Sequence, residues 1–272
     1  MLKILKKYTP FTKAGIQEAT SYRMNFIFYI SGNILSAFIM YFLWKAIFDA
    51  SDNQSLNGFT FEAMTMYIFI FFLTSTITSS GKNWGIGEEI RDGSIAMRIL
   101  KPLNFNLTYL FNELGNKVIE VSLIAIPILG GIELYRFYSM STFKFNLLNF
   151  SIYIFSLIIA YLINFYFNIC FGFSAFFFTN LWGTNLLKNC IVNLLSGAVI
   201  PLSFFSTNLI FILKLLPFAS FSYTPVMIYM GMYNGQQIIL SVILQMFWLL
   251  FFIVFSKIIW KIVIKHLCIQ GG

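Results

Sequence analysis

Long apolar runs limit what this sequence can fold into. Six of them are candidates for membrane-crossing helices, at about residues 24–48, 62–80, 110–134, 147–180, 186–205 and 236–264. A helix needs about 20 apolar residues to cross the roughly 30 Å hydrocarbon core of a bilayer. The fourth run is longer than one crossing requires, so we expect it to tilt, to bend near Gly172 or to extend beyond the membrane.

The composition agrees with a protein whose solvent is lipid. Of the 272 residues, 58% are hydrophobic and only 10% are charged, whereas soluble domains are about a quarter charged. A water-soluble core of this size cannot bury all 34 Phe residues. We therefore expect an all-α membrane protein, with one six-helix transmembrane domain at residues 24–272 and an N-terminal segment at residues 1–23.

The distribution of basic residues predicts how the spans are oriented. Six crossings place both termini on one side, and 14 of the 18 Lys and Arg residues fall on that side. The first loop on the other side, residues 49–61, carries Asp49 and Asp52 and no basic residue. The positive-inside rule therefore predicts cytoplasmic termini. The net charge of +8 is explained by the basic residues that orient the spans in the membrane. It does not indicate a nucleic-acid partner.

The first residues have the pattern of an amphipathic helix. On a helical wheel the apolar residues Leu2, Ile4, Leu5, Tyr8 and Phe11 fall on one half, and Lys3, Lys6 and Lys7 fall on the other. We expect this helix to lie in the membrane surface with its lysines toward anionic headgroups. Pro10 is expected to interrupt it. The helix is either an anchor alone or an elbow that also contacts a cytoplasmic partner.

The densest charged segment lies in the loop 81–107, between the second and third apolar runs. Its candidate functional residues are Glu88, Glu89, Arg91, Asp92, Gly93, Met97, Arg98, Leu100 and Lys101. Asp92 or Ser94 can cap a short helix, and Pro102 would end it. A cytoplasmic helix of about two turns is therefore expected here.

The expected short helix would have two different faces. Ile95 and Ile99 would share an apolar ridge, and Ser94, Arg98 and Lys101 would share a basic ridge. The four apolar residues of this helix, Met97 and Leu100 among them, would suit docking into a groove on a partner protein. An ordinary solvated loop is the alternative.

Charged residues also occur at the start of the third apolar run. Spacings of four and three residues place Glu113, Lys117 and Glu120 on one helical face. Charges at that depth are costly unless they are paired or face water. The simplest interpretation is an internal ion pair at the cytoplasmic end of the bundle. The alternative is a relay that joins the cytoplasmic loop to the membrane core.

Prolines interrupt the apolar sequence before the sixth run. Pro201, Pro217 and Pro225 divide it into pieces that are each too short to cross a bilayer. We expect two short helices that re-enter from the outer face, at residues 206–235. Backbone freed by such breaks must be buried in protein or line a cavity. The alternative is an irregular outer loop.

The sequence lacks the motifs of an enzyme. The only histidine, His266, lies in the C-terminal tail. Gly81-Lys82 lacks the remaining residues of a phosphate-binding loop. The three cysteines Cys170, Cys190 and Cys268 do not have metal-binding spacing. We therefore expect no catalytic residue, no metal site and no cofactor on this chain.

Several of these features together resemble a known family. They are the Arg91-Asp92-Gly93 and Leu100-Lys101-Pro102 triplets after the second run, the proline-broken stretch before the sixth, and the ending Gln270-Gly271-Gly272. With the basic N-terminal helix, the chain resembles the ABC-2 type permeases over essentially its whole length. It resembles in particular a small bacterial branch whose members are often encoded as adjacent pairs.

The resemblance implies a permease subunit of an ATP-driven exporter in a bacterial cytoplasmic membrane. Separate ATPase subunits would bind ATP and Mg²⁺, and a second permease chain, identical or sibling, would pack beside this one. The loop 81–107 would contain the coupling helix that seats on the ATPase, and residues 1–23 would be the connecting helix. A hydrophobic or amphipathic substrate is expected, such as a lipid, a drug-like compound or a peptide.

The resemblance also suggests where substrate would pass. The second and fifth spans would line the path, with Phe69, Phe72, Thr76, Asn193 and Ser196 as contact candidates, and Pro201, Pro217 and Pro225 would belong to an outer gate. Two other classes of function remain open: a secondary transporter or channel that works alone, and a membrane assembly scaffold. A secondary carrier usually has buried acids or an inverted repeat, and neither is evident here.

Overall fold

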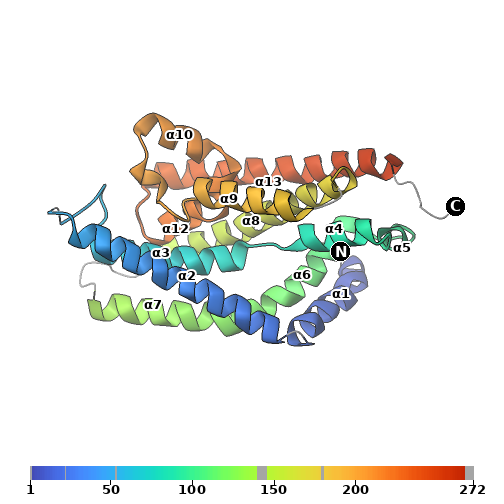
Figure 1. Cartoon of the computed structure of the whole chain (residues 1–272), viewed down its shortest axis with the longest axis horizontal. Helices are drawn as coiled ribbons and strands as arrows, with labels where there is room; N and C mark the ends of the chain where they lie inside the picture. The colour runs from blue at the N-terminus through green and yellow to red at the C-terminus, as the bar shows by residue number, and fades with distance from the viewer. Residues whose placement is uncertain (1, 22, 53, 140–145, 179–180, 267–272) are drawn as a thin grey trace.

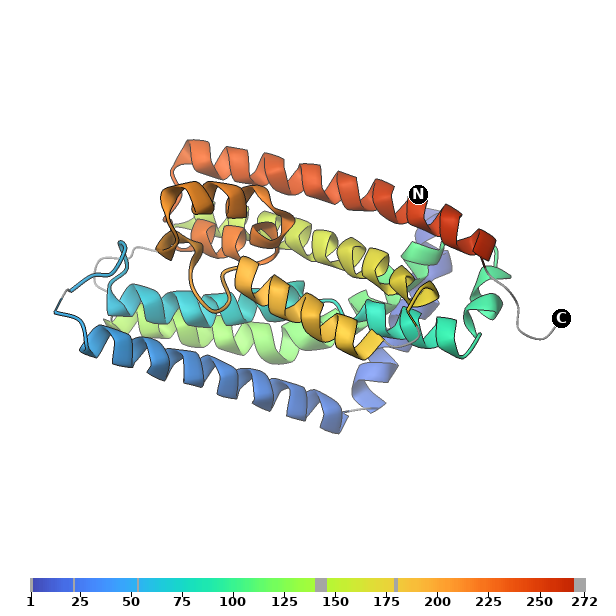
Figure 2. The same cartoon turned by 45° about the horizontal axis from the view of Figure 1, so that its top comes forward.

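Five helices have the length and composition needed to cross a membrane. A computed structural model of the chain describes residues 2–21, 23–52, 54–139, 146–178 and 181–266. Within these residues the candidate spans are Ile30–Asp49, Phe61–Arg91, Phe105–Arg136, Leu147–Phe176 and Gly235–Val263. They run side by side along the long axis of the bundle (Figures 1 and 2). The expected all-α membrane class is confirmed.

The long helices follow the apolar runs of the sequence. They are α2 (Arg23–Asp49), α3 (Phe61–Thr78), α6 (Phe105–Glu120), α7 (Ile126–Ser139), α8 (Leu147–Gly172) and α13 (Gly235–Val263). Polar caps fix several of their starts. The side chains of Asn104, Asn146 and Asn234 accept hydrogen bonds from the first-turn N–H groups of α6, α8 and α13.

Two of the long helices depart from regular α geometry. A π-helical turn, Val121–Ala125, joins α6 to α7. α8 ends at Gly172 and continues as the 3-10 turn Phe173–Phe176, at the position where a bend was expected. Each irregularity lies within one of the five candidate spans.

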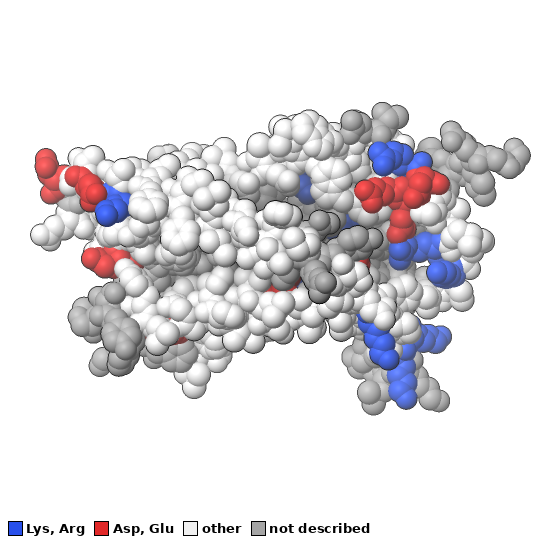
Figure 3. Space-filling view, turned by 60° about the horizontal axis from the view of Figure 1, so that its bottom comes forward, with Lys and Arg blue, Asp and Glu red and all other residues white. Residues whose placement is uncertain are grey.

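The charged side chains gather at the two ends of the bundle. On the face that Figure 3 shows, few Lys, Arg, Asp or Glu side chains appear between those ends. One end carries α1 (Leu2–Ser21), α4 (Lys82–Arg91), α5 (Ile95–Ile99) and the last described turn, Ile264–His266. The described chain therefore starts and finishes at the same end. The side chains of residues 2–5 and the tail 267–272 lie outside the described residues.

The helix α1 continues through Pro10, so the expected interruption there is wrong. Proline removes the N–H that would bond the carbonyl four residues earlier. Here the Thr9 hydroxyl donates to that carbonyl, on Lys6, at 2.9 Å. The side chain of Tyr8 also differs from the expected lipid-facing position. It is buried, accepts a hydrogen bond from the Asn104 N–H at 3.1 Å and stacks on Phe111 of α6.

α1 packs closely along α6. A Cβ added at Gly15 of α1 would lie 2.0 Å from the Asn112 carbonyl oxygen, and one added at Gly115 of α6 would lie 2.2 Å from the Thr12 carbonyl oxygen. Such distances are far inside van der Waals contact, so only glycine fits at both positions. The two glycines let the backbones of α1 and α6 touch.

The fifth predicted span, 186–205, is not one helix. α9 (Leu181–Leu195) has 15 residues and ends where Gly197 turns the chain with a φ of +82°. A short 3-10 helix, Leu202–Phe204, follows the turn. The expected helix end at residue 205 is wrong because the apolar run continues through this turn, and hydrophobicity alone does not mark the helix end. The six-span count is not reproduced by helix length.

Three short helices, not two, occupy the proline-broken region. They are α10 (Thr207–Leu215), α11 (Pro217–Phe221) and α12 (Tyr223–Tyr229), at the end of the bundle opposite α4 and α5 (Figures 1 and 2). α11 and α12 are largely buried and pack against α8. Gln245 of α13 accepts a hydrogen bond from the Ser156 hydroxyl at 2.8 Å and donates to the Ser220 carbonyl at 3.0 Å. These buried bonds join α8, α11 and α13.

Candidate functional site

The charged segment after α3 folds as two helices instead of the single two-turn helix expected. α4 contains Glu88, Glu89 and Arg91, and α5 has only five residues. Between them Gly93 has a φ of +78°, a conformation that favours glycine. The Asp92 carboxylate accepts a hydrogen bond from the Ser94 N–H at 2.9 Å. The hydrogen bonds from the Ser94 side chain and backbone lower the pKa of Asp92 from its ordinary value.

The apolar side of α5 faces the protein itself. Ile95 is 1% exposed and belongs to a cluster with Ile86, Phe105, Tyr109, Phe165, Ile169, Phe173 and Val263. Ile99 is partly buried against the same cluster. Of the four apolar residues expected to dock into a partner, Ile95 and Ile99 are therefore turned toward the bundle instead. The ridge instead seats α5 on the ends of α6, α8 and α13.

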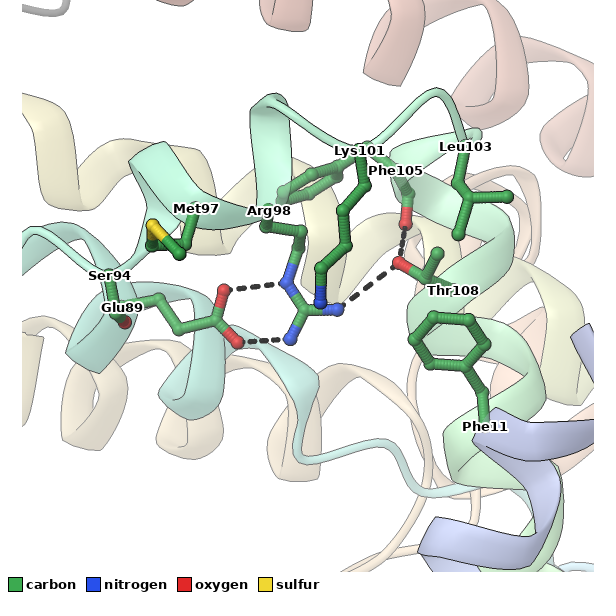
Figure 4. Close-up of a pocket in the computed structure, with 9 residues that line it drawn as sticks. All are labelled: Phe11, Glu89, Ser94, Met97, Arg98, Lys101, Leu103, Phe105 and Thr108. Atoms are coloured by element: carbon green, nitrogen blue, oxygen red, sulfur yellow. Dashed lines mark hydrogen bonds and ion pairs between the residues drawn. The ribbon is translucent and has the colours of Figure 1, made fainter.

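Arg98 also turns inward, so the basic ridge expected along α5 does not form. Its Nε donates to Glu89 Oε2 at 2.7 Å, and its Nη2 bonds Glu89 Oε1. Its Nη1 donates to the Thr108 hydroxyl at 3.2 Å, and its guanidinium carbon lies 4.2 Å from the centre of the Tyr109 ring. Figure 4 shows Arg98 between Glu89 and Thr108. We call these four residues the Arg98 clasp.

The Arg98 clasp joins three helices. Arg98 lies on α5, Glu89 on α4, and Thr108 and Tyr109 on α6. Burial acts to lower the pKa of Arg98, but the hydrogen bonds to Glu89 and the nearby negative charge outweigh it and raise the pKa. The guanidinium therefore stays charged, and α4, α5 and α6 are held as one unit.

Other residues of the segment face outward. Met97 is 67% exposed and Leu100 is 78% exposed. Glu88, Arg91, Asp92, Gly93 and Lys101 are also exposed. Met97 and Leu100 lie beyond the candidate spans, at the charged end of the bundle. Exposed apolar side chains on such a surface are typical of a contact with another protein.

A pocket of about 200 Å³ lies between α5, α1 and the start of α6. Its lining residues are Phe11, Glu89, Ser94, Met97, Arg98, Lys101, Leu103, Phe105 and Thr108 (Figure 4). Phe11 comes from the N-terminal helix, which the sequence did not link to this segment. Five of the nine lining residues were already noted in the charged segment.

A larger cleft, of about 640 Å³, lies deeper in the same half of the bundle. Its lining includes Lys117 and Glu120, which form an ion pair at 2.5 Å. Lys117 Nζ also donates to the Thr76 carbonyl at 2.9 Å. Glu113, 4% exposed, accepts a hydrogen bond from the Ser80 hydroxyl at 2.9 Å. Glu113, Lys117 and Glu120 thus lie beside the end of α3. Lys117 pairs with Glu120, and Glu113 is bonded to the Ser80 hydroxyl.

None of the residues suggested for a substrate path lines either of the two pockets described above. Phe69 and Phe72 are partly buried on α3, and Thr76 is buried near Lys117. Asn193 is exposed on α9, and Ser196 is buried just after it. The three gate candidates, Pro201, Pro217 and Pro225, are all buried at or near the starts of short helices.

These features define an integral membrane protein with a structured, partly apolar surface at one charged end. A family model described as "ABC-2 family transporter protein" matches residues 34–271. Since the match covers most of the sequence, the chain belongs to the ABC-2 transporter family. Members are membrane permease subunits that associate with an ABC ATPase and have no ATPase site of their own. Neither a curated protein nor a solved structure matches the chain.

Proposed function

We propose that this chain is the permease subunit of an ATP-driven exporter in a bacterial cytoplasmic membrane. It would move a hydrophobic or amphipathic substrate out of the cell, and ATP with Mg²⁺ would bind on a separate ATPase subunit. Family membership supports the pairing of a permease with an ATPase. The observation that carries the proposal is the exposure of Met97 and Leu100 on a helix whose other side is fixed to the bundle.

The proposed orientation places α4, α5 and both termini in the cytoplasm. α8 ends at this end of the bundle, while α13 begins at the opposite end (Figure 2). The chain between them must therefore pass from one end to the other, and α9 lies along that route. Its 15 residues extend about 22 Å. We assign α9 and the turn after it as the remaining crossing, which is the fifth of six in chain order.

The contacts of α5 support a route by which movement of the ATPase could reach the transmembrane helices. Movement of the ATPase would press on Met97 and Leu100 and would pass through the Arg98 clasp to α6. α6 is packed against α1 and is joined to α3 by the bond from Lys117 to the Thr76 carbonyl. The first three spans would therefore tilt together and open the bundle outward.

A second permease chain is part of the proposal. α9 exposes Asn193 among apolar residues such as Leu186 and Leu194. Amide side chains at membrane depth are costly when they face lipid. Contact with a second permease chain, with the substrate path between the two, would satisfy them. The short helices α10, α11 and α12 would form the outer gate.

The proposal is tested by co-purification and reconstitution. The full-length chain and its ATPase would be expressed together, and ATP-dependent flux would be measured in proteoliposomes. Replacing Met97 and Leu100 together by Glu should abolish ATPase recovery and lower flux at least about tenfold, since each buried apolar contact contributes roughly 1.5–3 kcal/mol. The matched control exchanges the two residues, Met97→Leu with Leu100→Met, and should keep both activities.

Two results would overturn the proposal. One is full recovery of the ATPase by the double Glu variant. The other is substrate flux that does not depend on ATP, which would favour a transporter or channel that works alone.

A further inference from the structure

The pocket between α1 and α5 combines an apolar rim with an excess of positive charge. Met97, Leu103 and Phe11 supply apolar lining. Arg98 and Lys101 supply two positive charges, and Glu89 supplies one negative charge. The pocket is partly open to the surface, and its lining residues come from α1, α4, α5, the chain after α5 and the start of α6 (Figure 4).

The positive charges of the pocket are not equally neutralised. Both carboxylate oxygens of Glu89 are bonded to the Arg98 guanidinium. Among the described residues, Lys101 forms no ion pair. Figure 4 shows the Lys101 side chain running into the pocket, although the residue as a whole is exposed. The pocket therefore carries one positive charge that this part of the chain does not balance.

The size and place of the pocket suit one side chain of another protein. Its volume of about 200 Å³ exceeds that of several waters, at roughly 30 Å³ each. Met97 belongs both to the pocket and to the exposed apolar surface of α5. A protein that covers Met97 and Leu100 would thus bring its own surface to the pocket opening. Met97 and Leu100 lie outside the candidate spans, which favours a protein over lipid as the group that covers them.

We propose that the pocket receives an acidic side chain of the ATPase subunit, whose carboxylate pairs with Lys101. This inference rests on the proposed function. Burying the carboxylate beside an intact Arg98–Glu89 pair keeps the local charge balanced. Because Phe11 of α1 lines the same pocket, the acidic side chain would lie against both α1 and α5. Charge pairs of this kind set partner choice and association rate.

The first experiment measures how tightly the purified ATPase binds the full-length permease in nanodiscs of neutral phosphatidylcholine. Lys101→Glu should weaken binding about tenfold or more, and Lys101→Ala about threefold to tenfold, because both remove the charge pair and the first also adds repulsion. The effect should shrink at high salt, which screens exposed charges. The matched control is Lys6→Glu, an exposed lysine of α1 outside the pocket, and it should change binding less than twofold.

The second experiment identifies the acidic residue on the ATPase. Each exposed Asp or Glu of the ATPase would be changed to Lys and tested against Lys101→Glu. One reversal should restore binding to Lys101→Glu while weakening binding to the wild-type permease. Failure of every reversal to rescue would overturn the inference.

The outcomes separate this inference from the proposed function. If the wild-type permease does not bind the ATPase at all, the proposed function fails. If wild type and Lys101→Glu bind the ATPase equally well, only the pocket assignment fails. If Lys101→Glu matters only in vesicles that contain anionic lipid, the pocket binds a headgroup and the assignment to the ATPase is overturned.

Discussion

Arg98 holds a surface helix in place with a side chain that is only partly exposed. Its guanidinium bonds both oxygens of Glu89, bonds the Thr108 hydroxyl and lies over the Tyr109 ring. A bidentate pair between a guanidinium and a carboxylate has a fixed geometry. The clasp therefore sets the position of α5 relative to α6 more strictly than apolar packing alone would.

Removing the Arg98 side chain should destabilise the protein and loosen α5 on α6. In Arg98→Ala the Glu89 carboxylate loses its partner in a site where both side chains are about three-quarters buried. We expect a loss of about 1–2 kcal/mol, since partial exposure weakens the pair. Thermal unfolding of the purified chain in detergent should show a lower Tm than wild type.

A double-mutant cycle provides the control for that prediction. Glu89→Ala alone should also lower the Tm, and the combined variant should cost less than the sum of the two single changes. Strict additivity of the two single effects would show that the pair contributes nothing to stability.

The residues of the clasp show which parts of the site could be predicted. The sequence places Glu89 and Arg98 in one charged segment, but a helical wheel cannot tell which side of a short helix faces inward. The two residues are nine positions apart across the Gly93 turn, so helical spacing rules do not pair them. Thr108 belongs to the polar start of the third span, and its role depends on tertiary packing.

At the level of elements, long apolar runs and polar caps explain most helix boundaries. The sequence did not predict α4, because the segment 82–91 is short and polar. This helix depends on its packing against α8. The end of α9 was missed for a different reason. The turn after it is held by a tertiary bond, in which the Tyr67 hydroxyl donates to the Gly197 carbonyl at 2.8 Å. Hydropathy contains no information about such a bond.

The crossing of α1 and α6 gives a prediction at this scale. Gly115→Ala would place a methyl group 2.2 Å from the Thr12 carbonyl oxygen, so the two helices must separate. Overpacking of this kind costs about 1–3 kcal/mol. We expect weaker disulfide cross-linking between cysteines placed on α1 and α6, and faster proteolysis of α1.

The control for the helix crossing lies on α7. At Gly130, an added Cβ meets none of the described atoms within 4 Å. Gly130→Ala should therefore leave cross-linking and proteolysis unchanged. Equal behaviour of Gly115→Ala and Gly130→Ala would contradict the close contact between α1 and α6.

At the scale of the whole molecule, the six-crossing assignment depends on α9. A version of the chain without its native cysteines would carry single cysteines, one at a time, at Ser55, Glu88 or Ser206. An impermeant maleimide should label Ser55→Cys and Ser206→Cys in intact cells, and Glu88→Cys only after permeabilisation. Labelling of Ser206→Cys only from the inside would mean that α9 does not cross and that the orientation of the following helices is reversed.

The π-helical turn Val121–Ala125 also changes how the third span must be interpreted. A single π-turn adds about one residue to an α-helix, and each residue of an α-helix turns it by about 100°. The face that carries Glu113 and Lys117 on α6 is therefore not continued by residues at helical spacing on α7. A substitution series that maps the lipid-facing side of this span should therefore allow for one extra residue at the π-turn. Without that allowance, the lipid-facing positions found on α6 and on α7 would not fall on one continuous face.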